Sequence, residues 1–275
     1  MKFIKTDVTP AIHEFRSELY RRFSAPIDGM WEKLFIASSQ HYLIINEGQN
    51  IGYCCIDDKN SLNQLYLCSE SNYLMDRVVQ TLVELKLISS AKLSSIEPVS
   101  FNACLANSKS VQINTFCFQH LNSPLEREFT LNVELVSKEN TQAVRVFLKD
   151  QIGFDDNFGY VENLVKRKEQ YMIRESGIII ATGECRLSDS QVGFADIGVV
   201  VNKDFQSKGL GTQVLQQLVK RAQQANRMPI CSTTYDNIAS KKAIEKAGFY
   251  CSHIIFDIEF IDEKNKKNDI PGIRI

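Results

Sequence analysis

The segment Gln206-Ser207-Lys208-Gly209-Leu210-Gly211 constrains the fold of this chain more than any other. It follows a run of mainly β-branched residues, Asp196 to Val201, and precedes residues with the apolar spacing of an amphipathic helix. The order is therefore strand, glycine-containing loop and helix N-terminus. Free backbone N–H groups and the positive end of the helix dipole meet at such a turn, where glycines let an anion approach the backbone. The pattern predicts a pyrophosphate-binding turn in an α/β fold.

The spacing of the glycines excludes two other phosphate-binding loops. The chain has no Gly-x-x-x-x-Gly-Lys-Ser/Thr here, so this is not a nucleoside-triphosphate loop, and it is not the Gly-x-Gly-x-x-Gly dinucleotide loop either. The order Gln206-x-x-Gly209-x-Gly211 after a strand resembles the acetyl-CoA loop of the GNAT superfamily of N-acetyltransferases. A glycine-rich turn without a ligand is the alternative interpretation of this loop alone.

A second motif, residues 237–249, supports the same resemblance. Asn237 suits a helix N-cap, and Gly248 suits the left-handed residue that ends a helix. Phe249 then begins an apolar strand. The pattern Asn-x-Ala-Ser-x-x-x-x-Glu-Lys-x-Gly-Phe resembles the second signature of the GNAT family. With both motifs in this order, the C-terminal half is identified as a member of that family.

Length and composition are those of an ordinary globular protein. The chain has 275 residues, of which 44% are hydrophobic, and its net charge of −1 gives no electrostatic case for nucleic-acid or membrane binding. No apolar run approaches the ~20 residues that span a bilayer, and the N-terminus lacks the apolar core of a signal peptide. Most of the eight cysteines lie in apolar runs without metal-ligand spacing. A cytoplasmic protein without a metal site is therefore expected.

The two halves of the chain have similar plans. Tyr42 to Ile45 and Ile51 to Ile56 form a predicted hairpin at Gly48, and residues 171–187 form another at Gly177. A strand and a long helix follow each hairpin. The similarity predicts two tandem copies of one α/β unit with a mixed α+β sheet, divided as 1–124 and 125–275. Chance likeness between two short hairpins is the alternative.

The first copy lacks the residues that equip the second for a cofactor. The counterpart of the glycine loop, residues 68–73, has no glycine and contains Glu70, whose charge would repel a pyrophosphate. The N-terminal half is therefore predicted to be a degenerate GNAT-like domain that does not bind CoA and instead helps to shape the acceptor pocket.

Other elements follow from hydrophobic periodicity and turn residues. In the N-terminal half the sequence predicts two helices within 11–36, broken near Pro26, a strand at 62–68, a helix at 72–87 and short elements up to His120. In the C-terminal half it predicts strands at 129–136, 192–201, 230–234 and 249–260, and helices at 141–149, 161–168, 210–222 and 237–247.

The family resemblance implies how acetyl-CoA is held. The strand ending at Val201 is expected to part from the strand Ile230 to Thr234, so that backbone groups of Val199 and Val201 pair with the pantetheine amides. The cofactor-binding residues implied are Val199, Val200, Val201, Gln206, Ser207, Lys208, Gly209, Leu210, Gly211, Thr212, Asn237 and Ser240. Lys208 is equally well explained as a solvated lysine, Asn237 as a plain cap and Ser240 as a small packing residue.

Two carboxylates are candidates for the general base that takes a proton from the acceptor ammonium. Glu184 lies on an otherwise apolar strand, and Asp196 lies on the strand before the glycine loop; Glu184 is preferred. Many GNAT members have a tyrosine acid in the second motif where this chain has Ile244. Tyr235 is the nearest substitute by sequence, although a packed or surface aromatic is the simpler interpretation.

The sequence thus predicts an acetyl-CoA-dependent N-acetyltransferase in which an amine attacks the thioester directly in a ternary complex. The alternative is a non-catalytic acyl-CoA-binding protein, which the missing tyrosine at Ile244 favours. An interaction module without a cofactor would not require Gly209 and Gly211. The acceptor can be a small molecule or a peptide amine, and the sequence leaves monomer and homodimer open.

Overall fold

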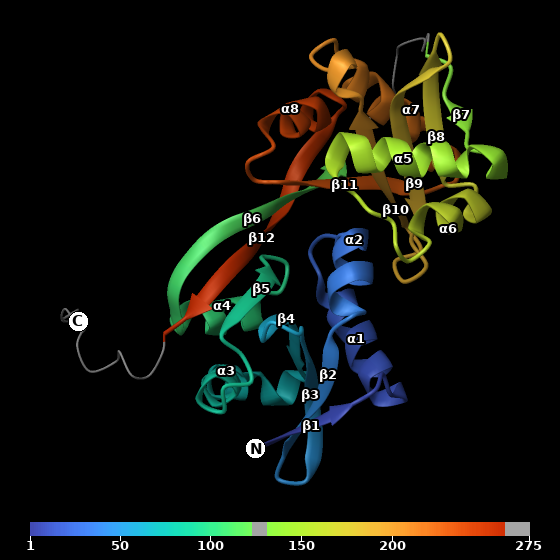
Figure 1. The fold of residues 1–275 in the computed structure, drawn as a ribbon. Coiled ribbons are helices and arrows are strands. Elements are labelled where there is room, and N and C mark those ends of the chain that lie inside the picture. Colours follow the sequence, from blue (N-terminus) through green and yellow to red (C-terminus); the bar gives the residue numbers. More distant parts are fainter. Residues whose placement is uncertain (123–130, 262–275) are drawn as a thin grey trace. The chain divides into compact units, whose positions relative to one another are not determined.

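The computed structural model describes residues 1–122 and 131–261, which form two compact units. The N-terminal unit comprises Met1–Phe116 together with the chain from His253 onward, and the C-terminal unit comprises Cys117–Ser252. Each unit is a mixed sheet flanked by helices (Figure 1). The predicted boundary after residue 124 lies outside the described residues, so the division into 1–124 and 125–275 stays a prediction. The compact units themselves are not consecutive halves of the chain.

The N-terminal unit contains strands, helices and two short helical turns. Its strands are β1 (Lys2–Thr6), β2 (Gln40–Asn46), β3 (Gln49–Ile56), β4 (Ser61–Leu67), β5 (Ser90–Ser94) and the first part of β6 (Ser108–His120). Its helices are α1 (Pro10–Arg22), α2 (Gly29–Trp31), α3 (Met75–Glu84) and α4 (Pro98–Ala106), with the π-helical turn η1 (Glu32–Ile36) and the 3₁₀ turn η2 (Ser69–Leu74). The sheet order is β1-β2-β3-β4-β5-β12-β6.

The core of the N-terminal unit lies between its sheet and α3. Met75, Val78, Val79 and Leu82 recur at helical spacing, so α3 presents one apolar face, and all four are buried. They pack against Leu65 and Leu67 of β4 and other apolar residues of the sheet.

The C-terminal unit repeats this plan. Its strands are β7 (Glu134–Leu135), β8 (Gln170–Glu175), β9 (Ile178–Leu187), β10 (Phe194–Val201), β11 (Met228–Thr234) and the first part of β12 (Phe249–Phe260). Its helices are α5 (Thr141–Ile152), α6 (Tyr160–Arg167), α7 (Leu210–Gln224) and α8 (Ile238–Lys246), with 3₁₀ turns η3 (Lys138–Asn140) and η4 (Lys203–Phe205). The sheet order is β12-β6-β11-β10-β9-β8-β7.

Each unit is completed by a strand from the other half of the sequence. β6 begins in the N-terminal unit and ends in the C-terminal unit, where it neighbours β11. β12 begins in the C-terminal unit and ends in the N-terminal unit, where Ile255 to Glu259 pair with β5. The two halves therefore exchange their last strands.

Most of the predicted elements are present. The hairpins turn at Gly48 and Gly177, both with φ of 82°, Asn237 caps α8, and Gly248 has a φ of 96° after it. The short elements expected before His120 include a long strand, β6, that the sequence analysis missed. Of the strand expected at 129–136, residues 129 and 130 lie outside the described range, and β7 covers only Glu134–Leu135.

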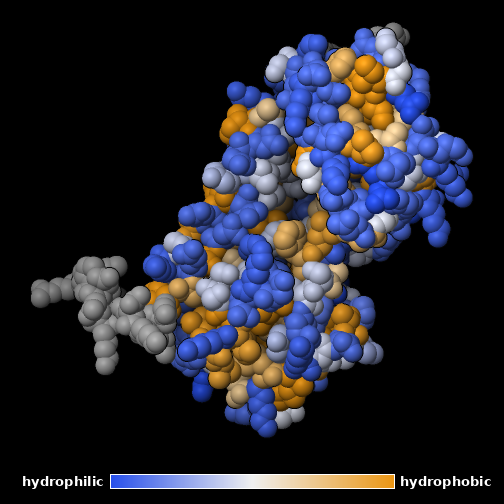
Figure 2. Space-filling model, in the orientation of Figure 1, coloured by the Kyte–Doolittle hydropathy of each residue, from blue (hydrophilic) through white to orange (hydrophobic). Residues whose placement is uncertain are grey.

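Hydrophilic side chains cover most of the visible surface, and apolar side chains form scattered areas on it (Figure 2). Among the described residues, no helix combines the length and the hydropathy needed to cross a membrane. The same part of the chain holds no group of three or more His, Cys, Asp or Glu side chains suited to a metal ion. All eight cysteines are free thiols.

Candidate functional site

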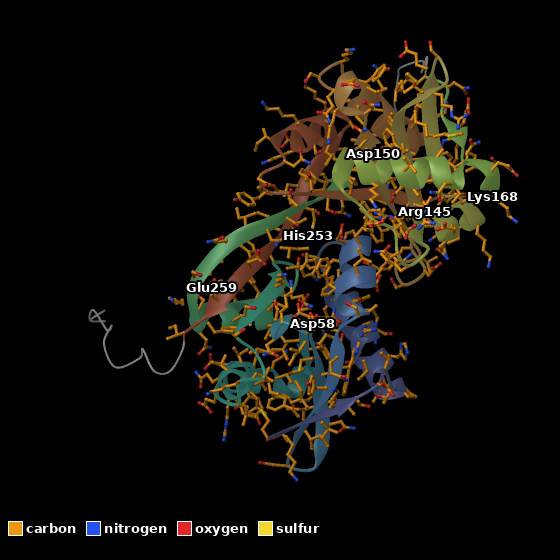
Figure 3. All side chains as sticks on the ribbon, viewed as in Figure 1. Asp58, Arg145, Asp150, Lys168, His253 and Glu259 are labelled. Atoms are coloured by element: carbon orange, nitrogen blue, oxygen red, sulfur yellow. The ribbon has the colours of Figure 1, made fainter. Side chains whose placement is uncertain are left out.

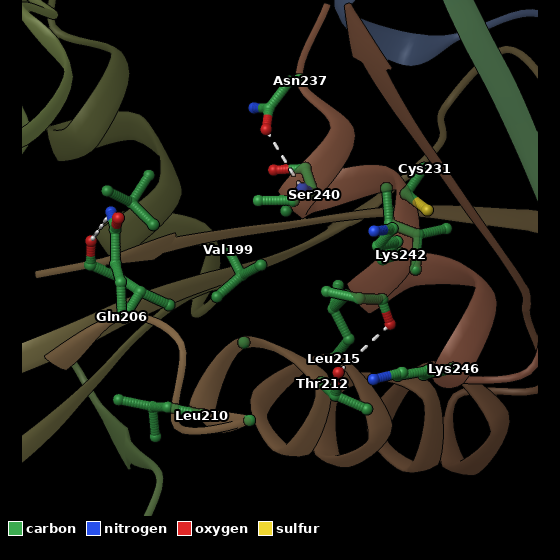
Figure 4. Close-up of a pocket in the computed structure, with 18 of the residues that line it drawn as sticks. Val199, Gln206, Leu210, Thr212, Leu215, Cys231, Asn237, Ser240, Lys242 and Lys246 are labelled. Carbon is green, nitrogen blue, oxygen red and sulfur yellow. Dashed lines mark hydrogen bonds between the residues drawn. The ribbon is translucent and has the colours of Figure 1, made fainter. Parts of the chain in front are cut away.

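A cleft of about 440 Å³ opens in the C-terminal unit where two parallel strands part. β10 and β11 are paired only from Phe194–Met228 to Asp196–Ile230, although β10 continues to Val201. The cleft is lined by the unpaired end of β10, the loop before α7 and the first turns of α7 and α8 (Figure 4). The predicted parting of these strands is confirmed.

The free edge of β10 presents backbone groups to this cleft. Asn202 donates its N–H to Ile180 O. Every second residue of an antiparallel strand bonds to the same neighbour, so the backbone groups of Val200 and Gly198 also bond to β9. The backbone groups of Val199 and Val201 consequently point to the other edge, where β11 has left. The Gln206 side chain already donates to Val201 O at 3.3 Å, which leaves the groups of Val199 available.

The N-terminus of α7 offers a second set of donors. The first intrahelical bond runs from the Gln213 N–H to Gly209 O, so the N–H groups of Leu210, Gly211 and Thr212 come before it. Gly209 has a φ of 79°, a left-handed conformation that suits glycine. These donors and the dipole of α7 converge on one side of the cleft, where they suit a phosphate group.

Helix α8 forms the opposite wall. Asn237 Oδ1 accepts the Ser240 N–H at 3.1 Å, as a helix cap does, and among the described residues the Asn237 amide nitrogen has no hydrogen-bond acceptor. Lys242 and Lys246 also line the cleft from α8 (Figure 4). The sequence analysis missed both lysines, although their spacing on a helix places them on one face.

The cleft brings together nearly all predicted cofactor-binding residues. Every one of them lines it except Lys208. The Lys208 ammonium lies 5.2 Å from the centre of the Phe205 ring instead. The solvated-lysine interpretation of Lys208 therefore fits the structure better than a phosphate contact.

Glu184 lies opposite Gly198 of β10, which lines the cleft, although Glu184 itself is not among the lining residues. A Cβ at Gly198 would lie 3.8 Å from Glu184 Oε2, so the glycine leaves the space between the carboxylate and the cleft open. The Glu184 side chain is 15% exposed. Its Oε2 accepts the Tyr160 hydroxyl at 2.7 Å and pairs with Arg186 at 3.2 Å.

Asp196 is more deeply buried. It is 4% exposed, and like Glu184 it pairs with Arg186, at 2.9 Å, and is not among the residues lining the cleft. Arg186 therefore bridges the two candidate bases. The sequence analysis missed Arg186. Glu184 and Arg186 are two residues apart on one strand, so their side chains could have been predicted to share a face.

Tyr160 is brought to Glu184 by a buried anchor at the start of α6. Asp156 accepts the N–H groups of Tyr160 and Val161, both at 2.8 Å, and pairs with Arg145. Figure 3 labels Arg145 on α5. Burial raises the pKa of Asp156, but these N–H bonds and Arg145 outweigh it, so the pKa lies below its ordinary value. Burial also raises the pKa of Tyr160, which keeps its hydroxyl protonated.

The candidate acid, Tyr235, lies outside the cleft lining. Tyr235 is 57% exposed. Ile244 lies in the cleft wall, as does Cys231, which is buried. The cleft therefore has an aliphatic side chain, Ile244, at the position where the family resemblance suggested a tyrosine acid.

Two protein-family models match the sequence. Residues 8–121 match a model described as an acetyltransferase (GNAT) domain, and residues 146–249 match one described as the acetyltransferase (GNAT) family. A search of curated proteins found no match.

Solved structures are similar over nearly the whole chain. An acetyltransferase of the GNAT family from Colwellia psychrerythraea has 28% identity and a TM-score of 0.89, and the alignment covers 95% of this chain and 100% of that one. A GCN5-related N-acetyltransferase from Sphaerobacter thermophilus has 14% identity and a TM-score of 0.66, with 94% and 95% covered. A tandem GNAT protein from the clavulanic acid biosynthesis pathway has 11% identity and a TM-score of 0.60, with 94% and 98% covered. The last two show a common fold alone.

Proposed function

Because this chain consists of two GNAT domains in tandem, we propose that its C-terminal unit transfers an acetyl group from acetyl-CoA to an amine. The observation that carries the proposal is the cleft between β10 and β11, with free backbone groups on one wall and the N-terminus of α7 on another. Acetyl-CoA supplies a thioester together with an amide-containing arm and a pyrophosphate.

The backbone of β10 and α7 would hold the donor substrate. The N–H groups of Leu210, Gly211 and Thr212 face the place suited to the pyrophosphate. The N–H and C=O of Val199 would pair with the arm as an added strand does. Asn237 keeps a donor for the same arm, since only its oxygen is used by the cap. Lys242 and Lys246 add positive charge beside the phosphates.

Glu184 is the carboxylate best suited to take a proton from the acceptor ammonium. It lies opposite Gly198, a residue of the cleft lining that leaves space beside the carboxylate, whereas the Asp196 side chain is more deeply buried and pairs with Arg186 at a shorter distance. The neutral amine then attacks the thioester carbon, a C–N bond forms, the nitrogen gives its second proton to water, and the C–S bond breaks to release a thiolate. Tyr160 and Arg186 fix the Glu184 carboxylate through its Oε2. We propose that the thiolate takes its proton from water, because Ile244 has no proton to give.

The first experiment is calorimetric titration with acetyl-CoA of the wild-type protein and of a Gly209→Glu/Gly211→Glu variant. We expect binding by the wild type and its loss in a variant whose circular dichroism is unchanged, since carboxylates would repel the pyrophosphate. No binding to folded wild-type protein would refute the proposal. Thiol release with a panel of amines then tests turnover.

A second candidate function, acyl-CoA binding without catalysis, is favoured by one observation, the aliphatic Ile244 in the cleft wall. The two functions differ in their response to Glu184→Gln. A transferase loses rate while keeping its affinity for acetyl-CoA, whereas a binding protein has no thiol release to lose with any amine tested.

A further inference from the structure

We infer that the N-terminal unit fills its own counterpart of the cleft with the Glu97 carboxyl group, so that only one of the two units receives an acyl-CoA arm. The statement that only one unit receives an acyl-CoA arm rests on the proposed function. The statement that Glu97 fills the groove does not rest on it and can be tested without any ligand.

The N-terminal unit contains the same parting of strands. β4 pairs with the parallel strand β5 only at Ser61–Ser90 and Leu62–Ala91, although β4 continues to Leu67. Cys68 donates its N–H to Ile51 O, as Asn202 does to Ile180 O in the other unit. By the same alternation, the Leu65 N–H points away from β3 into the parting, and Leu65 takes the position of Val199.

Glu97 occupies the place opposite this N–H group. It is the N-cap residue of α4, a nine-residue helix like α8, and so takes the position of Asn237. Asn237 is exposed, but Glu97 is only 4% exposed. Ser100 Oγ donates to its Oε2 at 3.5 Å, and the Leu65 N–H lowers the pKa of the Glu97 carboxyl group, as a nearby donor does. A buried carboxyl group of the protein thus lies beside the strand edge whose counterpart at Val199 is open.

Apolar side chains close the rest of the groove. Leu65 and Leu67 are buried, and so are Ala103 and Cys104 of α4, which belong to the same core cluster. β4 is buried along its whole length, whereas the end of β10 from Gly198 to Val201 is partly exposed. The turn after β4 is η2, which contains no glycine.

The Glu97 carboxyl group is buried, and its burial changes its pKa. Burial raises the pKa of Glu97 from 4.5 to about 8, while Ser100 and the Leu65 N–H oppose the shift. The titratable groups that interact with it are thiols, Cys55 of β3 and Cys104 of α4, and burial raises the pKa of both. Glu97 is therefore protonated at neutral pH in the folded protein.

This raised pKa has a defined consequence for stability. The folded protein holds the Glu97 proton more tightly than the unfolded chain. The contribution of this proton to the free energy of unfolding is therefore complete below pH 4.5 and is lost as pH rises toward about 8. The loss corresponds to at most roughly a three-thousandfold change in the unfolding constant.

The test follows the Leu65 amide by NMR in leucine-labelled wild-type protein between about pH 5.5 and 9. We expect its chemical shift to titrate with a midpoint near 8, and to be flat in Glu97→Gln, which keeps an acceptor oxygen but has no proton to lose. A Leu65→Met variant assigns the signal. A Leu65 amide that does not titrate in wild-type protein overturns the inference, whether or not the variant folds.

Urea unfolding of the same proteins gives an independent measurement. The wild type should lose stability from about pH 5.5 to 8.5 relative to Glu97→Gln, with Glu84→Gln, an exposed glutamate of α3, following the wild type. Parallel curves for the wild type and Glu97→Gln would contradict a buried, protonated Glu97. Neither measurement uses acetyl-CoA, so failure of the proposed function leaves this test intact.

Discussion

β4 of the N-terminal unit and β10 of the C-terminal unit each run past the last residue paired with their parallel neighbour. In the C-terminal unit the unpaired edge borders an open cleft, and in the N-terminal unit the protein itself covers it. The parting of strands is thus a property of the fold. We expect ligand binding to depend on a few positions, namely the loop that follows β4 or β10 and the N-cap residue of α4 or α8.

A third position separates the units in the same way. Counted from the turn glycines Gly48 and Gly177, Cys55 takes the place of Glu184. Gln64 lies opposite Cys55, where Gly198 lies opposite Glu184. In one unit a carboxylate therefore meets a residue without a side chain, and in the other a buried thiol meets a buried amide. Only the first arrangement places a carboxylate beside a residue that lines a cleft.

The largest expected effect comes from removing that base. Glu184→Gln should lower kcat by about 10²- to 10⁴-fold, the usual range for a general base, with little change in the affinity for acetyl-CoA. Thiol-release kinetics and calorimetry measure the two quantities. Cys55→Ala is the matched change in the N-terminal unit and should leave kcat unaltered. Equal losses from both variants would mean that the two positions do not differ in role.

Tyr160→Phe should lower kcat by roughly 10-fold or more, because it removes a hydrogen bond to a charged group worth about 1.5–3 kcal/mol. Since Tyr160 acts through Glu184, adding Tyr160→Phe to Glu184→Gln should lower kcat no further. A further loss of the same size in the double variant would assign Tyr160 a packing role. The matched residue near Cys55 is Arg16, and Arg16→Lys should leave kcat unchanged.

Lys242→Ala/Lys246→Ala should weaken acetyl-CoA binding by roughly 2- to 10-fold, the range for exposed ion pairs. The effect should shrink as salt is added, which calorimetry at two ionic strengths measures. The equivalent positions on α4 are Asn102 and Ala106, neither of them cationic. An Asn102→Lys variant that gained affinity would show that the N-terminal unit still receives the ligand.

The smallest effect concerns stability. Gly209→Ala should lower the free energy of unfolding by about 1 kcal/mol, because alanine is strained at a φ of 79°. Gly211→Ala should not, since a Cβ there would lie 3.5 Å from Val201 Cγ2, an ordinary contact. Urea unfolding compares the two. A destabilised Gly211→Ala with an unaffected Gly209→Ala would show that the two glycines have been assigned the wrong roles.

The features that the sequence predicts well are local. The strand, the loop around Gly209 and the helix are consecutive, and Asn237 and Gly248 mark the ends of one short helix. The roles of neighbouring side chains in space were not predictable in this way. Tyr160 reaches Glu184 from a separate helix, and an acidic residue before Pro98 reads as an ordinary helix start until its burial is known.

The exchange of strands was beyond sequence analysis for a different reason. An apolar strand at the end of each half has the same pattern whichever sheet it joins, because alternation fixes the faces of a strand and not its partner. Nothing in Phe249 to Phe260 therefore indicates that its second part pairs with β5.

That exchange links the two halves through the order of protein synthesis. Domains generally fold from the N-terminus as they leave the ribosome. Here the N-terminal unit lacks the strand beside β5 until residues 255–259 have been translated. The first half to be made is thus among the last to be finished, and during elongation β5 has an unpaired edge. A ribosome stalled before β12, or a truncated messenger, would damage the N-terminal unit while leaving the cleft residues of the C-terminal unit already translated.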